Sequence, residues 1–496
     1  MTGTSRSSQP IALSDETLGK LDPRVKVPRY DRTAVRAAIV HIGVGGFHRA
    51  HLATYVDELC SAGHTGWGIM GSGVLPHDRR MAEVLDRQDG LYTLIIRSAN
   101  ETSVRVIGSI LDYIHASPQT GSLIRRIAHP DTRLVSLTLT EGGYPVDGVT
   151  GGFDSSAAPA GPDSAFGVIV AALEQRQREG VGPLSVVSCD NVIGNGDVAR
   201  TATLGVAEER DPKLRNWIER TVSFPNSMVD RITPATTETD RDWLAKEYGV
   251  ADGWPVVSEP FRQWVVEDSF EGDRPPWEEV GVTVTSDVEP YELMKLRLLN
   301  AGHSCMAYLA ALAGVERVDS AMAEPGVDRF LRRFLVTEAG PVLPQIPGID
   351  VPAYMASLLE RFANPAIGDQ ISRLCLDGSA KFPKFLLPTV RAQLARRGPV
   401  DLSALALAGW CAYLMGKADD GSAMTLASDP DLESARAYAL NSIEQPSNFL
   451  EYRPVFGDDL SRDPGFVESF TRALRSLRAV GVRSTLDVLV PNSQQG

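Results

Sequence analysis

The chain has few cysteines: five in 496 residues, with no C-x-x-C pair. A disulfide framework and a cysteine-rich structural zinc site do not fit this odd, scattered set, which comprises Cys60, Cys189, Cys305, Cys375 and Cys411. The N-terminal stretch MTGTSRSSQPIALSDETLGK lacks the apolar core of a signal peptide, and no later run approaches the roughly 18 to 20 apolar residues of a membrane span. We therefore expect a reducing, cytoplasmic setting.

The sequence also has fewer basic residues than acidic ones. The sequence has 49 Lys and Arg against 63 Asp and Glu, a formal net charge of -14. Nucleic acids and anionic membranes select for basic patches, so neither is an expected partner. With 43% hydrophobic residues the chain can build two or three sizeable cores, and small molecules become the more plausible ligands.

Apolar runs and helix-like segments alternate through the first part of the chain, which predicts an α/β fold with a mainly parallel sheet. Buried strands are expected at 37–43, 66–73, 133–140 and 185–190, and an amphipathic helix at 166–180. From about Pro290 the strand signal fades and helical periodicity takes over, as in 403–418 and 466–481. We predict an N-terminal α/β domain at 1–285, with a loose tail at 1–20 and a surface loop at 148–167, and a mostly α-helical domain at 286–496.

A glycine-rich turn follows the first apolar strand in IVHIGVGGFHRAH. Gly43, Gly45 and Gly46, with Phe47 behind them, stand where a dinucleotide-binding turn would let the backbone approach a pyrophosphate. His48 takes the place of the third glycine of G-x-G-x-x-G, which would hold the helix farther from its strand. A purely structural turn remains the alternative, because such glycine patterns are weak evidence alone.

An acidic residue that binds the adenosine ribose is expected after the second strand. No acid ends that strand, and Asp78 is the first one in the following loop, GIMGSGVLPHDRRM. Asp78 would favour NAD, because a carboxylate binds the ribose diol and repels a 2′-phosphate. Arg79 and Arg80 could instead attract that phosphate, and a solvated charged loop is the third reading.

The stretch KLRLLNAGHS places polar side chains in an otherwise apolar helix. At about 100° per residue, Lys295, Glu292, His303 and Asn300 fall at roughly 0°, 60°, 80° and 140°, on one side of the axis. A buried lysine can act as a general base, an asparagine amide can donate to an alkoxide, and a histidine can orient a hydroxyl. A snorkelling lysine paired with Glu292 and a satisfied core histidine are the structural alternatives.

Further candidates come from three other stretches of the chain. SVVSCDNVIGNG ends a strand with Asp190 and Asn191, and Asn191 would be a second oxyanion donor or the start of an Asx turn. Charged side chains suited to gripping hydroxyl or carboxylate oxygens are Asp230 and Arg231 in FPNSMVDRITP and Arg373 and Lys381 in RLCLDGSAKFPKF. As isolated charges, these would more often be surface residues.

In this order, GVGGFHRAH, TEGGY, SCDN, FPNSMVDRITP, WPVVSEPF, KLRLLNAGH and DGSAKFPKF resemble the mannitol dehydrogenase family of polyol-specific long-chain dehydrogenases/reductases. The resemblance runs from about Val27 to about Leu489. It implies a Rossmann-type domain followed by a helical domain, a nicotinamide cofactor, no metal, and a substrate bound between the domains. The family is often monomeric, so a monomer is expected.

The resemblance also implies residue roles. By it Lys295 is the catalytic base, Asn191 and Asn300 form the oxyanion hole, His303 orients the substrate, and Glu292 gates proton exchange. Asp230 and Arg373 match substrate-contacting positions, and Asp78 matches a cofactor-selecting position although His77 departs from the glutamate found before it. Lys381 remains a substrate candidate.

The leading expectation is NAD-dependent oxidation of D-mannitol to D-fructose. Within the family, D-arabinitol or sorbitol oxidation and fructuronate or tagaturonate reduction are the rivals. A non-catalytic nucleotide-binding sensor is a rival from another class, which the lysine, asparagines and histidine disfavour because a sensor needs no base. Zinc-dependent oxidation is disfavoured because no ordered Cys, His and Glu ligand set appears.

Overall fold

A computed structural model describes residues 9–147, 150–156, 161 and 163–491, and all structural statements concern these residues. The chain divides into two compact units, Met1–Glu289 and Pro290–Gly496, close to the predicted boundary at residue 285. Within the described residues, no helix is long and apolar enough to cross a membrane.

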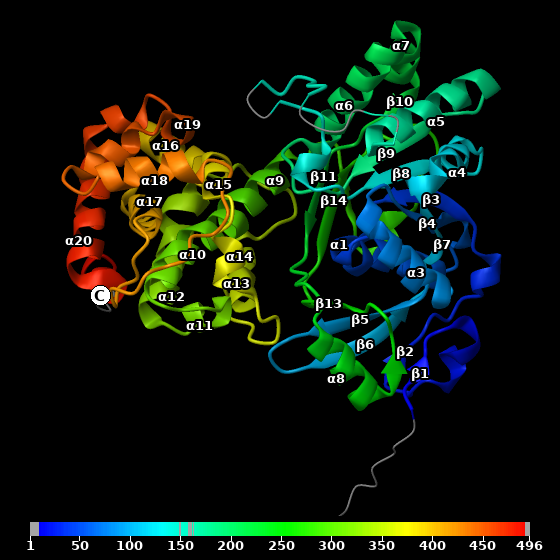
Figure 1. Ribbon diagram of the computed structural model, residues 1–496, viewed down its shortest axis with the longest axis horizontal. Helices are drawn as coiled ribbons and strands as arrows, with labels where there is room; N and C mark the ends of the chain where they lie inside the picture. The colour runs from blue at the N-terminus through cyan, green and yellow to red at the C-terminus, as the bar shows by residue number, and fades with distance from the viewer. Residues whose placement is uncertain (1–8, 148–149, 157–160, 162, 492–496) are drawn as a thin grey trace, which may run out of the picture. The chain divides into compact units, whose positions relative to one another are not determined.

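A six-stranded parallel sheet forms the centre of unit 1 (Figure 1). Its strands are β3 (Ala37–Ile42), β4 (Gly68–Gly73), β7 (Ile110–His115), β8 (Leu134–Leu137), β9 (Leu184–Ser188) and β10 (Val222–Ser223). They lie in the spatial order β7-β4-β3-β8-β9-β10, and every neighbouring pair is parallel. Numbered along the chain, this is the order 3-2-1-4-5-6 of a Rossmann fold, so the predicted fold class is confirmed.

Both faces of this sheet are covered, as its almost continuous apolar strands predict. Ile39 of β3 belongs to a core with α2 and Trp264, whereas its neighbours Val40 and Ile42 belong to a second core with the helices on the other face. The helices of unit 1 are α1 (Gly46–Ala50), α2 (Leu52–Ser61), α3 (Arg79–Arg87), α4 (Ala116–Ala128), α5 (Ala165–Glu179), α6 (Asn195–Arg210), α7 (Pro212–Thr221) and α8 (Glu238–Tyr248).

Three smaller sheets complete unit 1. Their strands are β1 (Ile11–Ala12), β2 (Val25–Lys26), β5 (Tyr92–Arg97), β6 (Thr102–Ile107), β11 (Ser227–Asp230), β12 (Val250–Ala251), β13 (Val256–Ser258), β14 (Gln263–Glu267) and β15 (Thr283–Thr285). The sheet orders are β13-β5-β6-β2, β11-β14-β15 and β1-β12.

The N-terminus differs from the expected loose tail at 1–20. Residues 1–8 lie outside the described part, but β1 pairs with β12 and a 3-10 helix spans Asp15–Lys20. Leu13 and Leu21 anchor this segment in a core with β5 and β6, and two apolar residues in a polar stretch were too weak a signal to predict that. The predicted loop at 148–167 lies partly outside the described residues, and α5 begins within it at Ala165.

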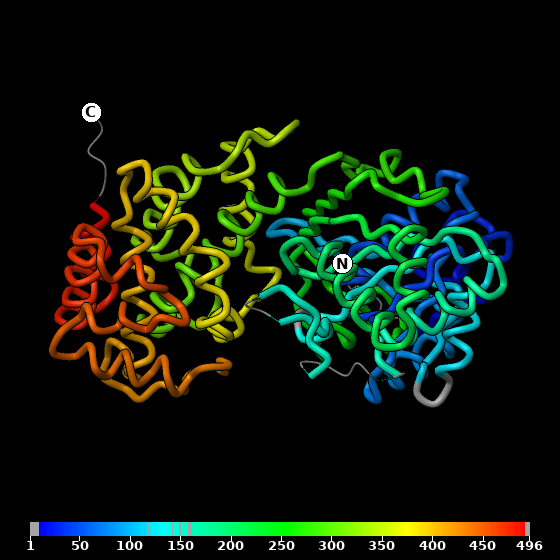
Figure 2. Tube along the Cα trace, turned by 90° about the horizontal axis from the view of Figure 1, so that it is seen from above, coloured from blue at the N-terminus to red at the C-terminus, as the bar shows by residue number. Residues whose placement is uncertain are grey.

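Unit 2 is built from helices, and in the part that the structure describes it has isolated bridges but no strand (Figure 2). Its α-helices are α9 (Glu289–Lys295), α10 (Ala301–Leu312), α11 (Val318–Met322), α12 (Pro325–Phe334), α13 (Val351–Phe362), α14 (Ile371–Leu374), α15 (Gly378–Phe385), α16 (Leu387–Ala395), α17 (Asp401–Leu414), α18 (Leu432–Asn441), α19 (Arg453–Phe456) and α20 (Pro464–Leu489). Two π-helical stretches, η7 (Leu296–Asn300) and η8 (Leu335–Ala339), interrupt this pattern.

Candidate active site

The glycine-rich turn between β3 and α1 combines one crowded glycine with one open glycine. Gly43 has φ +99°, and a Cβ there would lie 2.1 Å from the backbone oxygen of Thr138, so only glycine fits. A Cβ at Gly45 would meet nothing closer than the Gly43 oxygen at 3.9 Å. The turn is therefore packed tightly against β8 and leaves space above Gly45, which is what a bound pyrophosphate requires.

His48 is fully buried and fills the space that a third glycine would leave empty. Its ring stacks on that of His41 in β3, with ring centroids 3.4 Å apart. Burial lowers the pKa of His41 to about 3 and that of His48 well below its ordinary value, so both rings are neutral. A stacked pair of imidazoles thus packs α1 against β3 in place of a third glycine.

Asp78 lies at the end of the second strand even though it follows that strand in sequence. A Cβ on Gly73, the last residue of β4, would lie 2.4 Å from the Asp78 side chain, and the Asp78 carboxylate accepts a hydrogen bond from the Leu75 N–H at 2.9 Å. The two arginines beside it have other partners. Arg79 forms an ion pair with Glu83 at 2.9 Å, and Arg80 stacks over Trp254 at 4.4 Å. This arrangement favours a ribose diol over a 2′-phosphate.

The carboxyl end of β9 carries the predicted oxyanion donor. Asn191 is exposed, whereas Asp190 immediately before it is buried and binds the loop after β8. This is the edge of a parallel sheet where α/β proteins bind ligands.

Asp230 and Arg231 separate into different environments. Asp230 ends β11 and pairs in register with Gln263 of β14. The guanidinium group of Arg231 is buried and donates to the backbone oxygens of Ala50 and Glu259. Arg231 therefore holds backbone together, and the structure does not support it as a group that grips substrate.

The predicted catalytic helix is not a uniform α-helix. It runs from α9 through the π-helical stretch η7 into α10, and the N–H of Ala301 donates to the carbonyl of Leu296 five residues earlier. Lys295 is the last residue of α9 and Asn300 the last of η7, with side chains only 8% and 9% exposed. The angles calculated for a regular helix are therefore wrong beyond Lys295, because a π-helical turn takes up an extra residue.

The extra residue brings the polar side chains closer together around the axis. If one residue is absorbed between Lys295 and His303, Asn300 moves from roughly 140° to roughly 40°, and His303 from roughly 80° to roughly 340°. Lys295, Asn300 and His303 then span an arc of roughly 60°, and Glu292 at roughly 60° widens it to roughly 80°, compared with roughly 140° in a regular helix. The π-helical stretch therefore gathers the predicted catalytic groups onto one narrow face.

His303 has neighbours that the sequence pattern did not reveal. Its ring stacks on Phe362 at the end of α13, with centroids 4.0 Å apart. Burial would raise the pKa of Asp369, but the hydrogen bond and charge of Arg373 lower it below its ordinary value, and a weaker electrostatic interaction with His303 acts in the same direction. Arg373 Nε donates to the buried carboxylate of Asp369 at 2.7 Å, so one predicted site residue binds a carboxylate that interacts electrostatically with another.

Lys381 lies on α15, and Arg373 on α14. Both helices pack against α10, and α15 also contacts η7. Unit 2 thus brings Arg373 and Lys381 to the neighbourhood of the Lys295 helix. Asn191, Asp230 and the glycine-rich turn belong to unit 1.

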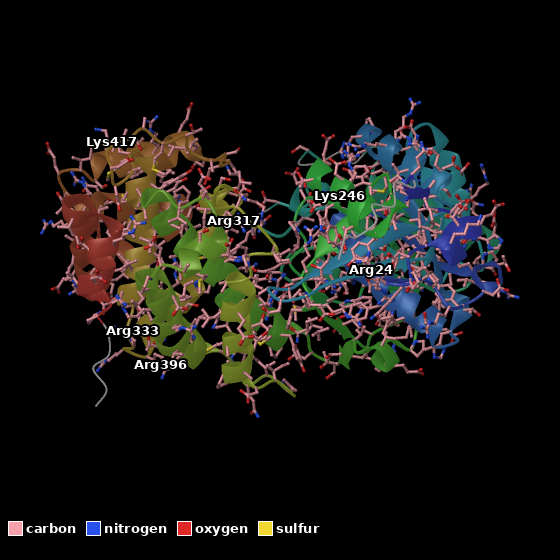
Figure 3. All side chains as sticks on the ribbon, turned by 90° about the horizontal axis from the view of Figure 1, so that it is seen from below. Arg24, Lys246, Arg317, Arg333, Arg396 and Lys417 are labelled. Atoms are coloured by element: carbon pink, nitrogen blue, oxygen red, sulfur yellow. The ribbon has the colours of Figure 1, made fainter. Side chains whose placement is uncertain are left out.

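Other features of unit 2 lie apart from these residues. A cavity of about 260 Å³ is lined by Arg333, labelled in Figure 3, together with Glu338 and Asp401, and no predicted site residue lines it. Among the residues that the structure describes, no group of three or more His, Cys, Asp or Glu side chains is placed to hold a metal ion.

Comparison with known families assigns both units. Residues 37–279 match the mannitol dehydrogenase Rossmann domain, and residues 287–478 match the mannitol dehydrogenase C-terminal domain. The chain belongs to the mannitol dehydrogenase family. The expected relationship is thereby confirmed for both halves of the sequence.

Individual members of the family are similar over nearly their whole length. The mannitol 2-dehydrogenase of Phaeosphaeria nodorum is 43% identical over 96% of this chain and 85% of that protein. The mannitol 2-dehydrogenase of Aspergillus fumigatus is 41% identical over 96% of this chain and 99% of that protein. Among solved structures, the Pseudomonas fluorescens mannitol 2-dehydrogenase in ternary complex with NAD and D-mannitol is 42% identical, with a TM-score of 0.88 over 97% of this chain and 100% of that one. A substrate-free D-sorbitol dehydrogenase is 33% identical, with a TM-score of 0.88 over 96% of this chain and 100% of that chain.

Proposed function

We propose that this chain catalyses the reversible oxidation of a sugar alcohol to a ketose, D-mannitol and NAD+ giving D-fructose, NADH and a proton. The observation that carries the proposal is a largely buried helix with a π-helical stretch between Lys295 and His303, in which Lys295 and Asn300 are buried. Its support is the similarity, over nearly the full length, to a solved enzyme whose complex holds NAD and D-mannitol.

The residues around the glycine-rich turn fit a dinucleotide. In the proposal, Gly43, Gly45 and Gly46 receive the pyrophosphate, Phe47 follows them into α1, and Asp78 binds the adenosine ribose. NAD is favoured over NADP, because the Asp78 carboxylate repels a 2′-phosphate. When bound, the cofactor supplies a nicotinamide ring that accepts the hydride from the carbinol carbon.

The chain's own residues handle the proton and the developing negative charge. The neutral Nζ of Lys295 takes the proton of the substrate hydroxyl, and the side-chain amides of Asn191 and Asn300 donate hydrogen bonds to the oxygen as it becomes alkoxide-like. His303 orients the same hydroxyl. Glu292, on α9 just before Lys295, passes the proton on to solvent.

Substrate choice is assigned to the charged side chains away from the reacting carbon. We infer that Asp230, Arg373 and Lys381 contact the remaining hydroxyls. A second candidate reaction is sorbitol oxidation, which the likeness to a D-sorbitol dehydrogenase favours, although that enzyme's 33% identity is below the 42% of the mannitol enzyme. We also propose a cytoplasmic monomer, since all five cysteines are buried free thiols, as a reducing compartment allows.

The deciding experiment is the initial rate of NADH formation with D-mannitol, D-arabinitol, D-sorbitol and D-mannonate, repeated with NADP+ and with EDTA. We expect the highest kcat/KM with D-mannitol and NAD+, unchanged by EDTA. Activity confined to D-mannonate would assign the chain to the uronate reductases. Binding of NADH without turnover of any polyol would instead support the sensor.

A further inference from the structure

The buried carboxylate of Asp190 has three donors, all from the loop that follows the neighbouring strand. It accepts hydrogen bonds from the backbone N–H groups of Leu139 at 2.9 Å and Thr140 at 2.8 Å, and from the hydroxyl of Tyr144 at 2.6 Å. Tyr144 is itself buried, and burial, with the charge of Asp190, raises the pKa of its phenol well above the ordinary value. The phenol therefore remains a donor throughout the working pH range.

The loop held by Asp190 is strained. Thr140 has φ +66° and ψ 166°, a conformation that is unfavourable for a β-branched residue. The two N–H groups bound by Asp190 belong to Thr140 and to the residue before it, so the carboxylate fixes the strained peptide directly. Without that carboxylate the backbone would be free to relax.

The same loop is fastened to β3 on its other side. The Thr138 hydroxyl donates to the Gly43 carbonyl at 2.6 Å, and His41 Nε2 lies 2.9 Å from that hydroxyl. The Nδ1 atom of His41 lies 2.8 Å from the Ser136 hydroxyl, which completes the network. Because β9, β8 and β3 are adjacent in the sheet, this side of the loop forms a rigid base against which Asp190 can rest.

The backbone of Asp190 is anchored as well. Asn195 donates its side-chain amide to the carbonyl oxygens of Asp190 at 3.1 Å and Ser227 at 2.8 Å. Asp190 is therefore fixed through both its side chain and its main chain, while the next residue, Asn191, is exposed. A fixed residue immediately before an exposed one determines where the exposed side chain can reach.

We propose that Asp190 is a positioning residue for Asn191: by binding the strained loop after β8, it holds the turn after β9 so that the Asn191 amide meets the substrate oxygen. The inference rests on the proposed function, in which Asn191 donates to that oxygen. Asp190 itself touches neither substrate nor cofactor in this scheme. Its effect on the reaction passes through Asn191.

The test is a double-mutant cycle with Asp190→Asn and Asn191→Ala, measured as kcat and KM for D-mannitol in the full-length protein. An asparagine at 190 presents an NH₂ group to one of the two backbone N–H donors and releases it. We expect each single variant to lose about 100-fold in kcat with a change in mannitol KM of less than about threefold. In the Asn191→Ala background, Asp190→Asn should cost less than about threefold more, because the group that it positions has gone.

A second variant guards against misfolding. Tyr144→Phe removes one of the three donors and keeps the packing, so it should lower kcat by about fivefold, an effect that also disappears in the Asn191→Ala background. Asp131→Asn, in an exposed turn, is the matched control. Additive losses of kcat in either cycle would overturn the positioning role and leave the proposed polyol reaction intact. A normal kcat in both the Asp190→Asn and the Tyr144→Phe variant would overturn it as well. A wild-type enzyme without polyol turnover would instead refute the proposed function.

Discussion

Two helical segments of unit 2 are largely buried and yet different in kind. α17 is a regular helix whose sequence, DLSALALAGWCAYL, is buried from Leu402 onward. The segment from α9 to α10, against which α17 packs, is also largely buried, but it contains Lys295, Asn300 and a π-helical stretch. In the first, burial serves packing alone. In the segment from α9 to α10, polar side chains occupy part of the buried surface.

The difference shows where a stable fold accepts a local cost. A π-helical turn and a buried lysine are both less favourable than a regular apolar helix. Unit 2 tolerates them because neighbours such as α17 supply the packing. The two segments should therefore respond in different ways to substitution: the segment from α9 to α10 through catalysis, and α17 through stability.

The largest effect is expected for Lys295→Ala. Loss of the general base should lower kcat for D-mannitol by about 10⁴-fold, with NADH affinity almost unchanged. The free energy of unfolding should be unchanged or slightly higher, because a buried amine has been removed. Steady-state rates, NADH fluorescence titration and urea unfolding measure the three quantities, with Lys295→Met as the control for side-chain bulk. A near-normal rate would remove Lys295 from the mechanism.

The counterpart on α17 is Trp410→Ala. Trp410 is 1% exposed and packs against the rings of Phe382, Phe449 and Phe456. Its truncation should lower the free energy of unfolding by about 3–5 kcal/mol. Measured well below the melting temperature, kcat should stay within about twofold of wild type. A large loss of kcat in a fully folded sample would show that the two segments are not separable in this way.

Sequence reasoning reached the fold because the fold depends on periodicity. The four buried strands at 37–43, 66–73, 133–140 and 185–190 correspond to β3, β4, β8 and β9, and the helix at 166–180 to α5. Their apolar runs had a single physical interpretation. The glycine-rich turn was likewise readable, since Gly43 is confined by a contact that excludes any side chain.

The site was only partly readable, because its geometry depends on contacts between distant residues. Nothing in KLRLLNAGHS distinguishes a π-helical turn from a regular one, since that choice follows from packing around η7. Phe362, which stacks on His303, and Asp369, which interacts with it electrostatically, lie about sixty residues further along the chain. Arg231 looked like a candidate for substrate because its backbone partners could not be foreseen.

A third prediction concerns Glu338, whose buried carboxylate accepts hydrogen bonds from the N–H groups of Leu402 and Ser403 at the start of α17. Burial raises the pKa of Glu338 to about 7, although the hydrogen bonds from Ser403 and Leu402 act to lower it. The unfolded chain therefore loses this proton near its ordinary pKa of about 4.5, before the folded chain does. Stability from this group should fall as pH rises from about 4.5 to 7, by up to about 3 kcal/mol, and then level off.

Glu338→Gln tests this directly, because glutamine does not titrate. Urea unfolding of wild type and variant is measured between pH 4.5 and 8. From pH 4.5 to about pH 7, the unfolding free energy of the wild type should fall relative to that of Glu338→Gln, and above pH 7 the difference should stay constant. The exposed Glu468→Gln should show no such trend. Parallel pH profiles for wild type and Glu338→Gln would mean that the carboxylate is ionised throughout.

The smallest effect is expected for Asp369→Asn, on the polar side of the comparison. Asp369 binds Arg373 through both carboxylate oxygens and interacts electrostatically with His303, so the neutral amide should loosen two groups proposed to contact substrate without removing the base. We expect mannitol KM to rise about tenfold while kcat stays within about threefold, the pattern of lost ground-state binding. Asp319→Asn is the matched control, because Asp319 forms an ion pair at 2.9 Å with Arg317, which is labelled in Figure 3, in the same unit. A fall in kcat equal to the fall in kcat/KM would mean that Asp369 supports the transition state, and that the catalytic face of the helix extends beyond α10 to the loop before α14.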